Sequence, residues 1–412
     1  MKKQEVKRKM AEIRAYISDF EKLGYGLFVH FGLYSVLGKG EWAKLLLNIS
    51  DAQYEALAER FSVKEQWAQN LVKTAKAAGC KYITVTTRHH DGFSLYDTKG
   101  LNNYDAPHSK CGRDLIKEFV FACRDNGVTP FFYHTLLDWR HRDYNENFPR
   151  YIDYLIKSIE VLCTSYGKIG GFWLDGTWNK PQADWQEDRL YATIRKHQPQ
   201  AMIINNTGIS REGEVGHPEI DSVTFERGKP AFADNFDRHR AGEMCQVLND
   251  HWGYAKNDCN YKSVKTLIEN LVDCRLNNCN FLLNTGLLGN GSVNPADKSI
   301  LGEVGKWVKV NKGFIYSVKS AEIKCQNAAL LKDGEYYYAV IFNVPMSSNP
   351  DSTFTAAEDI VKIPLKGVKQ ILWLDDKSAV KYVSNQSGVE FRPRPFPYGT
   401  SLAVRVARIK TK

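Results

Sequence analysis

Short apolar runs alternate with segments of helical pattern through the first three quarters of the chain. Near-continuous apolar strands separated by helices indicate a parallel sheet covered on both faces. Eight such strands fit a (β/α)8-type barrel, and no GxGxxG motif follows the first strand to favour the rival doubly wound sheet. The expected strands are residues 25–32, 81–90, 129–135, 170–176, 201–206, 222–227, a weak one at 251–255, and 280–286.

Two of the intervening segments carry clear helix signals. In residues 65–79 the side chains of Trp67, Leu71, Ala75 and Ala78 fall on one face of a helix. The segment DLIKEFVFACRDNG opens with Asp114, a good N-cap residue, and closes at Gly127, a good C-terminal stop. We therefore expect helices between the second and third strands and before the second.

The pattern changes after about residue 315. Closely spaced strand-like runs with little helical period follow, and in SLAVRVARI the residues Leu402, Val404 and Val406 alternate with smaller or charged neighbours, as in a half-buried strand. The sequence therefore predicts two domains, a catalytic barrel over residues 1–314 and a C-terminal antiparallel β-sandwich over residues 315–412. The four runs are residues 334–343, 368–376, 387–395 and 401–409.

Composition narrows the class of protein only slightly. Hydrophobic residues make up 43% and charged residues 25% of the 412 residues, which is ordinary for a globular protein. The net charge of +9 is spread along the chain, and its densest segment, MKKQEVKRKM, is interpreted as a solvated amphipathic helix. No recognisable nucleic-acid-binding module accompanies it, so we expect no nucleic-acid partner.

Cysteine spacing and hydropathy give further expectations. The nine cysteines are irregularly spaced and predict no disulfide framework, and Cys274 and Cys279 lack the further ligands that a zinc site needs. No apolar run of about 18 residues is present, so no membrane span is expected. The N-terminus has no apolar core that would mark a secretory signal, which favours a cytoplasmic location unless a leader has been removed.

Polar residues recur where the predicted strands end. In a barrel the carboxyl ends of all the strands face one side, where the loops build the active site. Residues far apart in the sequence would therefore converge on one pocket. They are His30, His89, His90, Tyr133, His134, Asp175, Asn205, Asn206, Glu226, Trp252 and Asn284.

Two carboxylates among tryptophan and histidine side chains suit the hydrolysis of a glycosidic bond. One of Asp175 and Glu226 would attack or guide water while the other protonates the leaving oxygen. A metal hydrolase is the competing barrel chemistry. Neighbours such as His89 and His90 point to opposite sides of a strand, and neither HxH nor HExxH occurs, so we expect no metal and no cofactor.

Several motifs together resemble the α-L-fucosidases of glycoside hydrolase family 29. They are GYGLFVHFGLYSV, GEW at residues 40–42, KYITVTTRHHDGFSLYDTK and WLDGTW. FLLNTGLLGNGSV followed by LGEVGKWVKVNKGFIY is similar to the segment that closes that family's barrel. The resemblance runs in order from about residue 25 to residue 316.

The resemblance implies a (β/α)8-like barrel with a C-terminal β-sandwich, and a retaining exo-α-L-fucosidase that forms a covalent glycosyl-enzyme. Asp175 would be the nucleophile and Glu226 the acid/base, with Glu41 as the reserve for that role. The expected substrate is a fucosylated oligosaccharide or glycoconjugate. Tyr133 and Trp173 would form an aromatic wall, and the sugar hydroxyls would be bound by His30, Glu41, Trp42, His89 and His90.

Two departures and two alternatives stay open at this point. The family's usual His-Trp-Gly reads His30-Phe31-Gly32, and its usual proline after Leu-Leu-Asn-x-Gly is Leu287; both changes are expected to alter the pocket rim. One alternative is a fucose-binding protein without catalysis. The other is a retaining hydrolase that prefers a sugar of like stereochemistry, such as an α-L-galactoside.

Overall fold

The computed structural model describes residues 15–207, 213–231, 239–349 and 359–411. The predicted basic helix at residues 1–10 lies outside these ranges. Helical residues 15–23 precede the first strand, and Ile17 and Phe20 are buried among side chains of the barrel interior. The chain therefore closes one end of the barrel before it enters the first strand.

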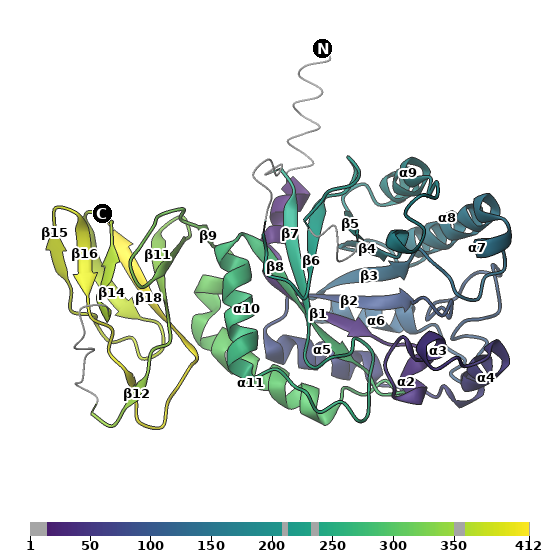
Figure 1. Ribbon diagram of the computed structural model, residues 1–412, viewed down its shortest axis with the longest axis horizontal. Helices are drawn as coiled ribbons and strands as arrows, with labels where there is room; N and C mark the ends of the chain where they lie inside the picture. The colour runs from purple at the N-terminus through teal and green to yellow at the C-terminus, as the bar shows by residue number, and fades with distance from the viewer. Residues whose placement is uncertain (1–14, 208–212, 232–238, 350–358, 412) are drawn as a thin grey trace, which may run out of the picture.

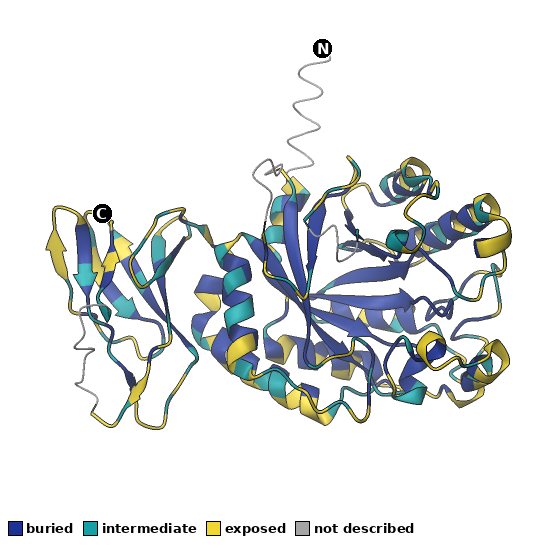
Figure 2. Ribbon diagram, viewed as in Figure 1, coloured by how far each residue is buried: buried dark blue, intermediate teal, exposed yellow. Residues whose placement is uncertain are grey.

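Eight parallel strands form a closed barrel in sequence order, as predicted (Figure 1). Strand β8 returns to β1 with Gly26 opposite Leu282, which closes the ring. The strands are almost wholly buried, because helices and loops cover their outer faces (Figure 2). Their bounds are β1 Tyr25–His30, β2 Tyr82–Arg88, β3 Thr129–Thr135, β4 Gly171–Asp175, β5 Met202–Asn206, β6 Ser222–Glu226, β7 Ala241–Val247 and β8 Cys279–Gly286.

The helix signals read from the sequence are confirmed in two places. The face of α5 that carries Trp67 and Leu71 is buried, and Asp114 caps α6 by accepting a hydrogen bond from the backbone N–H of Lys117. The helices are α2 Tyr34–Leu37, α3 Ala43–Leu46, α4 Asp51–Glu55, η1 Ala56–Arg60, α5 Trp67–Ala78, α6 Leu115–Asp125, α7 Asp143–Glu146, α8 Phe148–Ser165, η2 Thr177–Asn179, α9 Glu187–His197, α10 Val264–Leu276 and α11 Pro295–Ile315.

The predicted seventh strand at residues 251–255 is wrong. The seventh strand is β7, with the sequence AGEMCQV, and the residues around Trp252 form a loop. The error has a physical reason, because β7 carries Glu243 and Gln246 where an apolar strand was expected. Glu243 accepts hydrogen bonds from Tyr82 and Trp173 inside the barrel, so a charged residue is tolerated in this buried strand. The sequence of β7 therefore lacks the apolar pattern by which the other strands were recognised.

Antiparallel strands follow the barrel, and the four runs predicted there correspond to β11, β14, β16 and β18, the last of which extends beyond its run to Thr411. A five-stranded sheet has the order β14-β18-β11-β10-β9, and a three-stranded sheet has the order β13-β16-β15, while β12 and β17 form a short parallel pair. The strands are β9 Lys319–Ser320, β10 Ala329–Lys332, β11 Tyr336–Phe342, β12 Met346–Ser347, β13 Val361–Ile363, β14 Val368–Trp373, β15 Val383–Asn385, β16 Gly388–Phe391, β17 Phe396–Pro397 and β18 Val404–Thr411.

The five-stranded sheet lies between two apolar cores, so the expectation of a half-buried strand at residues 401–409 is wrong. One face of β18 packs with the three-stranded sheet through Ala407 and Ile409. Its other face joins the barrel's core through Val404 and Val406, and α10 and α11 lie on that side (Figure 1). A domain boundary between residues 314 and 315 stays a prediction, since these cores run across it.

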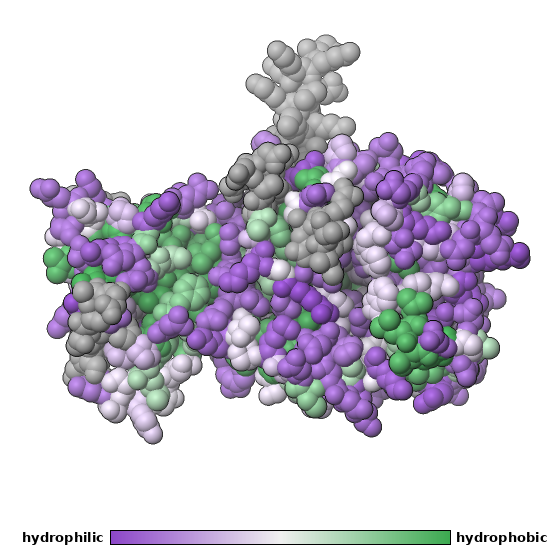
Figure 3. Space-filling view, in the orientation of Figure 1, coloured by the Kyte–Doolittle hydropathy of each residue, from purple (hydrophilic) through white to green (hydrophobic). Residues whose placement is uncertain are grey.

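Two surface and chemical features complete the fold. Three consecutive leucines on and after α3 form an apolar patch in Figure 3, with Leu45, Leu46 and Leu47 exposed by 47%, 70% and 50%. None of the nine cysteines forms a disulfide. Among the described residues, no helix combines the length and the apolar character that crossing a bilayer requires.

Candidate active site

A cavity of about 730 Å³ opens at the carboxyl ends of the barrel strands. Its size is in the range of small-molecule sites. All nine residues predicted to form the site line this cavity, which brings together residues from β1, β3, β4 and β6 and from two loops. The lining comprises Phe28, His30, Glu41, Trp42, His89, His90, Tyr133, Trp173, Asp175, Trp178, Asn206, Glu226, Arg227 and Trp252.

The barrel places the key polar side chains at one level. His30, Asp175, Asn206 and Glu226 are the last residues of β1, β4, β5 and β6. Parallel strands end on the same side of a barrel, so these four side chains meet although they are far apart in the sequence. The convergence expected from the strand-end pattern is confirmed for these positions.

His89 and His90 both face the cavity because the strand stops before them. Residues 81–90 were expected to form one strand, but β2 ends at Arg88. Beyond the strand end the alternation of side chains no longer applies, and the two imidazole rings lie 4.2 Å apart between centroids. The expectation that His89 and His90 point to opposite sides of a strand is therefore wrong.

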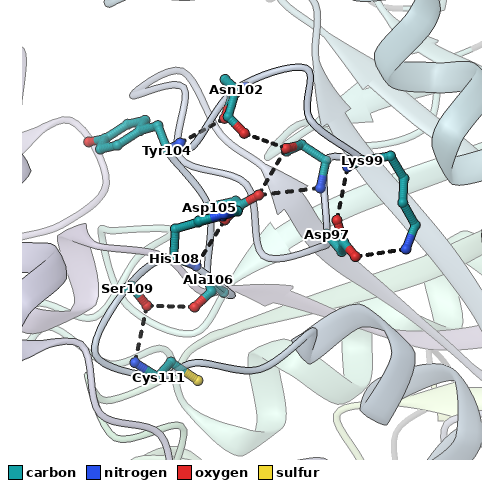
Figure 4. Close-up of polar contacts among 10 residues, drawn as sticks. Asp97, Lys99, Asn102, Tyr104, Asp105, Ala106, His108, Ser109 and Cys111 are labelled. Atoms are coloured by element: carbon teal, nitrogen blue, oxygen red, sulfur yellow. Dashed lines mark hydrogen bonds and ion pairs between the residues drawn. The ribbon is translucent and has the colours of Figure 1, made fainter.

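The loop between β2 and α6, which starts with these histidines, is held by polar contacts of its own (Figure 4). Asp105 is its centre: its carboxylate accepts hydrogen bonds from Thr98 Oγ1 at 2.9 Å and from the backbone N–H of His108 at 3.1 Å. Leu95 N–H donates to the Thr87 carbonyl at 2.8 Å and ties the loop back to β2. A loop braced in this way holds the histidines in fixed positions.

Asp175 is 8% exposed and accepts hydrogen bonds on both carboxylate oxygens. Tyr133 Oη donates to Oδ2 at 2.9 Å, and Trp178 Nε1 donates to Oδ1 at 2.9 Å. Burial raises the pKa of Asp175, and the bonds from Trp178, Tyr133 and Asn206 oppose that rise by stabilising the charged form. The carboxylate is thus oriented and under-solvated, as a nucleophile requires.

Glu226 faces Asp175 across a shared donor. Nδ2 of Asn206 lies 2.9 Å from Oε2 of Glu226 and 3.3 Å from Oδ1 of Asp175. These two oxygens can therefore be no further apart than the sum of the two distances. Burial, followed by the charge of Asp175, raises the pKa of Glu226, which favours a protonated acid opposite an ionised partner.

Neighbouring groups fix the proton on each of two cavity histidines. Asn284 Nδ2 donates to the Trp252 carbonyl at 2.7 Å, so its Oδ1 accepts from Nδ1 of His30 at 2.7 Å. Thr135 Oγ1 donates to the Leu137 carbonyl and is left to accept from Nδ1 of His90 at 2.7 Å. Nε2 of each ring is then unprotonated.

Burial keeps these rings neutral. It lowers the pKa of His30 and the pKa of His90 to about 3, and it lowers the pKa of His89 as well. His90 Nε2 lies 3.6 Å from Asp175 Oδ2, too far for a hydrogen bond. Nδ1 of His89 is buried with no hydrogen-bond partner among the described residues. His30 and His90 therefore offer Nε2 acceptor atoms that sugar hydroxyls can satisfy.

Aromatic rings form two walls around the carboxylates. Trp42 and Trp178 stack with centroids 6.0 Å apart, and Trp42 meets His90 edge-on at 5.6 Å. On the other side Tyr133 stacks on Trp173 at 5.7 Å. Such faces suit the apolar side of a sugar ring or a methyl group.

The buried carboxyl group of Glu243 supports Trp173, a residue of the cavity lining. Trp173 Nε1 donates to Glu243 Oε1 at 2.9 Å, and Tyr82 Oη donates to the other oxygen of Glu243. Burial raises the pKa of Glu243 to about 7, with these two bonds opposing the rise. Glu243 supports Trp173 from below but does not line the cavity.

Glu41, the reserve acid, also lines the cavity but is already engaged. Its Oε2 accepts a hydrogen bond from the backbone N–H of Gly253 at 2.7 Å. A Cβ at Gly253 would lie 2.9 Å from the backbone nitrogen of Glu41, so glycine permits this close approach. Burial raises the pKa of Glu41. The contact ties the loop that carries Trp42 to the loop that carries Trp252.

Some of the strand-end residues predicted to converge on the pocket do not line the cavity, and some residues that do line it were given no role in the sequence analysis. His134 and Asn205 point out of the barrel, since neighbouring side chains on a strand alternate; Asn205 accordingly bonds Tyr191 Oη at 2.9 Å. Asn206 and Trp252 stood among the strand-end residues without a role. The lining residues given no role in the sequence analysis are Phe28, Trp178, Asn206, Arg227 and Trp252.

The two departures from the family pattern do not reach the rim, contrary to expectation. Phe31 packs in the core against Phe61 and Trp67, with centroids 5.4 and 5.5 Å away. Leu287 is fully buried, and its N–H donates to the His30 carbonyl at 3.1 Å. Neither residue lines the cavity. Both changes therefore affect packing beneath the site.

A buried and a half-buried carboxyl group joined through one amide, neutral histidines and tryptophan walls at the mouth of a (β/α)8 barrel define a glycoside hydrolase. The α-L-fucosidase family profile matches residues 2–313, and the chain belongs to that family, as the resemblance implied. Its activity is accordingly that of an α-L-fucosidase acting on fucosylated substrates.

Individual relatives agree with this family. The tissue α-L-fucosidase of Mus musculus is 27% identical over 343 residues, which cover 75% of this chain and 73% of the relative. That of Bos taurus is 25% identical over 388 residues, covering 86% and 81%. The structure of α-L-fucosidase isoenzyme 1 from Paenibacillus thiaminolyticus superposes with a TM-score of 0.83 at 28% identity, covering 97% of this chain and 100% of that one.

Proposed function

We propose that this α-L-fucosidase removes terminal α-L-fucosyl residues with retention of configuration, with Asp175 as nucleophile and Glu226 as acid/base. The shared hydrogen bonds of Asn206 carry this proposal. They limit the separation of the nearest carboxyl oxygens to less than about 6.5 Å, where the range typical of inverting enzymes begins. A water molecule for direct displacement needs that wider gap.

The reaction takes place in two displacements at the anomeric carbon. In the first, an Asp175 carboxylate oxygen attacks the carbon while Glu226 gives its proton to the leaving glycosidic oxygen, so the aglycone departs as an alcohol. In the second, Glu226 takes a proton from water, and the resulting oxygen nucleophile displaces the Asp175 ester. Free fucose is released, and both carboxyl groups regain their starting protonation.

The histidines and rings position the sugar for these steps. Nε2 of His30 and Nε2 of His90 accept hydrogen bonds from sugar hydroxyls, because the Nδ1 proton of each ring is already donated to Asn284 or Thr135. His89 lines the same cavity and is a further residue for binding a hydroxyl. The walls formed by Tyr133, Trp173 and Trp42 face the apolar parts of the ring, including its methyl group.

The stereochemistry of azide products tests the proposal. With Asp175→Ala, azide replaces the nucleophile in one displacement, and an aryl α-L-fucoside should yield the β-L-fucosyl azide. With Glu226→Ala, azide attacks the ester of Asp175 in the second displacement, and the α-L-fucosyl azide should form. Products of the opposite configuration, or no azide adduct from either variant, would overturn the assigned roles.

A substrate comparison separates the remaining alternatives. Wild-type protein incubated with 4-nitrophenyl α-L-fucoside and with the α-L-galactoside should release 4-nitrophenol faster from the fucoside, because the additional hydroxyl at C6 of the galactoside would face aromatic carbon. Faster release from the galactoside would contradict this assignment. Binding without release would indicate a sugar-binding protein.

A further inference from the structure

Arg227 is a charged group of the cavity lining that the two displacements proposed above do not use. It follows Glu226 directly, lines the same cavity and is exposed. Among the described lining residues it is the only lysine or arginine, and burial keeps the cavity's histidines neutral. A neutral sugar such as fucose needs no cation for its recognition. Arg227 therefore calls for another partner.

The backbone holds Arg227 in an uncommon conformation. Its φ angle is 59°, in the left-handed region that non-glycine residues rarely adopt because it is strained for them. Its N–H donates to the Cys245 carbonyl at 2.9 Å, which continues the pairing of β6 with β7 by one residue. Strain kept in this way at a cavity commonly serves to aim a side chain.

The side chain is also braced. Its guanidinium lies over the ring of Trp252, 5.2 Å from the centroid, and one nitrogen donates to the Asp250 carbonyl at 3.0 Å. No carboxylate of the described residues forms an ion pair with it. An arginine stacked on a ring in this manner keeps further N–H groups in a fixed plane, which matches the geometry of carboxylate and sulfate oxygens.

A purely catalytic role fits poorly. The charge of Arg227 lowers the pKa of Glu226 and so favours the ionised form, whereas the first displacement needs Glu226 protonated. Asp175 is stabilised instead by its bonds from Tyr133 and Trp178. The charge of Arg227 thus does not hold Glu226 in the protonated form that begins the first step, and we place its benefit in binding.

We propose that Arg227 binds an anionic group, a carboxylate or a sulfate ester, on the sugar to which fucose is attached. This rests on the proposed function, because Glu226 as the acid marks the side of the cavity where the leaving group lies. Arg227 stands next to it on that side, and Trp252 offers a ring beside it. The enzyme would then favour acidic fucosylated glycans over neutral ones.

The experiment compares kcat/KM on three fucosylated oligosaccharides of one backbone. One is neutral, one carries a sialic acid and one carries a sulfate ester on the residues next to fucose. Wild type should cleave at least one acidic substrate about three- to tenfold faster than the neutral one, as expected for a charge-assisted contact that is partly exposed. The preference should shrink at high salt.

Variants assign the preference to this residue. Arg227→Gln should bring the acidic-to-neutral ratio close to one, and Arg227→Lys should keep part of it. Lys229→Gln is the matched control, since it removes the same charge two residues away, where Lys229 pairs with Asp273 at 3.1 Å outside the cavity lining. Its ratio should equal that of wild type.

Each outcome of the comparison either supports or overturns the proposal. A higher kcat/KM with only one of the two acidic substrates supports it and identifies the acidic group of that substrate as the ligand. A wild-type ratio of one or less for both acids, or a ratio that survives Arg227→Gln, overturns it. Failure to release fucose from all three oligosaccharides would overturn the proposed function itself, and this inference with it.

Discussion

The barrel contains two buried carboxyl groups with nearly the same donors. At the mouth, Asp175 accepts from Tyr133 Oη and Trp178 Nε1. In the interior, Glu243 accepts from Tyr82 Oη and Trp173 Nε1. Each carboxyl group is therefore bound by one tyrosine and one tryptophan.

The difference between the two lies in access. Asp175 lines the cavity and receives a third bond from Asn206, which also bonds a second acid. Glu243 is 1% exposed, does not line this cavity and supports Trp173. Donors of the same kind thus serve a carboxyl group that is open to the cavity in one place and a carboxyl group that supports a tryptophan in the other. Four changes test that contrast.

The largest effect is expected for Asp175→Ala. Without the nucleophile no covalent intermediate forms, so kcat/KM on an aryl α-L-fucoside should fall by about four orders of magnitude or more. Steady-state kinetics measure the loss, and circular dichroism together with fucose binding shows that the barrel is intact. Glu243→Gln should cost far less activity. A loss of less than tenfold for Asp175→Ala would contradict its role.

The next largest effect is expected for Glu226→Ala and should depend on the leaving group. Loss of a general acid costs about 10² to 10⁴ in rate when the departing alcohol needs a proton. A 2,4-dinitrophenyl fucoside departs without one and should be affected much less. Glu41→Ala is the matched control, and a leaving-group dependence found there instead would transfer the role to Glu41.

A smaller change in rate, but a clear change in pH dependence, is expected for Asn206→Ala. Asn206 stabilises the ionised forms of both Asp175 and Glu226, so its loss should raise both pKa values. Both limbs of the pH profile of kcat/KM should move to higher pH. Asn205→Ala removes a neighbouring amide that points away from the cavity, and its limbs should not move. Limbs that stay in place in Asn206→Ala would refute the shared hydrogen bond.

The smallest effect on activity, and a distinct one on stability, is expected at Glu243. Its pKa rises from 4.5 in the unfolded chain to about 7 in the folded one, so the folded chain holds a proton that the unfolded chain has released. The free energy of unfolding should therefore fall as pH rises through that window, by about 3 kcal/mol. Urea unfolding at several pH values measures it, and Glu243→Gln should flatten the slope. An equal slope in both proteins would contradict the shift.

The sequence could predict much of the fold because the barrel strands are apolar and end in recognisable residues. Asp175 stands out at the end of GGFWLD, where a charge needs a reason. The strand β7 could not be found in this way, since its Glu243 is satisfied by donors from β2 and β4 that only the closed barrel brings near.

Side-chain direction is the other part that the sequence could not give. Asn205 and Asn206 look alike along the chain, yet alternation turns one outward and the other into the cavity. His89 and His90 both face the cavity only because β2 ends at Arg88. The sequence does not fix the end of a strand to within one or two residues. The fold class, the family and the place of Asp175 in the cavity were accessible from motifs, but the contacts among the cavity's polar groups depend on the closed barrel.

The seam between the barrel and the C-terminal sheets has a practical consequence. Trp307 of α11 is buried, and its Nε1 donates to the Val404 carbonyl of β18 at 3.1 Å, at the far end of the chain. A ribosome must therefore finish nearly the whole polypeptide before this indole finds its acceptor. A chain that stops near residue 315 would expose the apolar surface of α11 that β18 otherwise covers. We expect such a truncated protein to precipitate or be degraded rather than to yield a minimal enzyme.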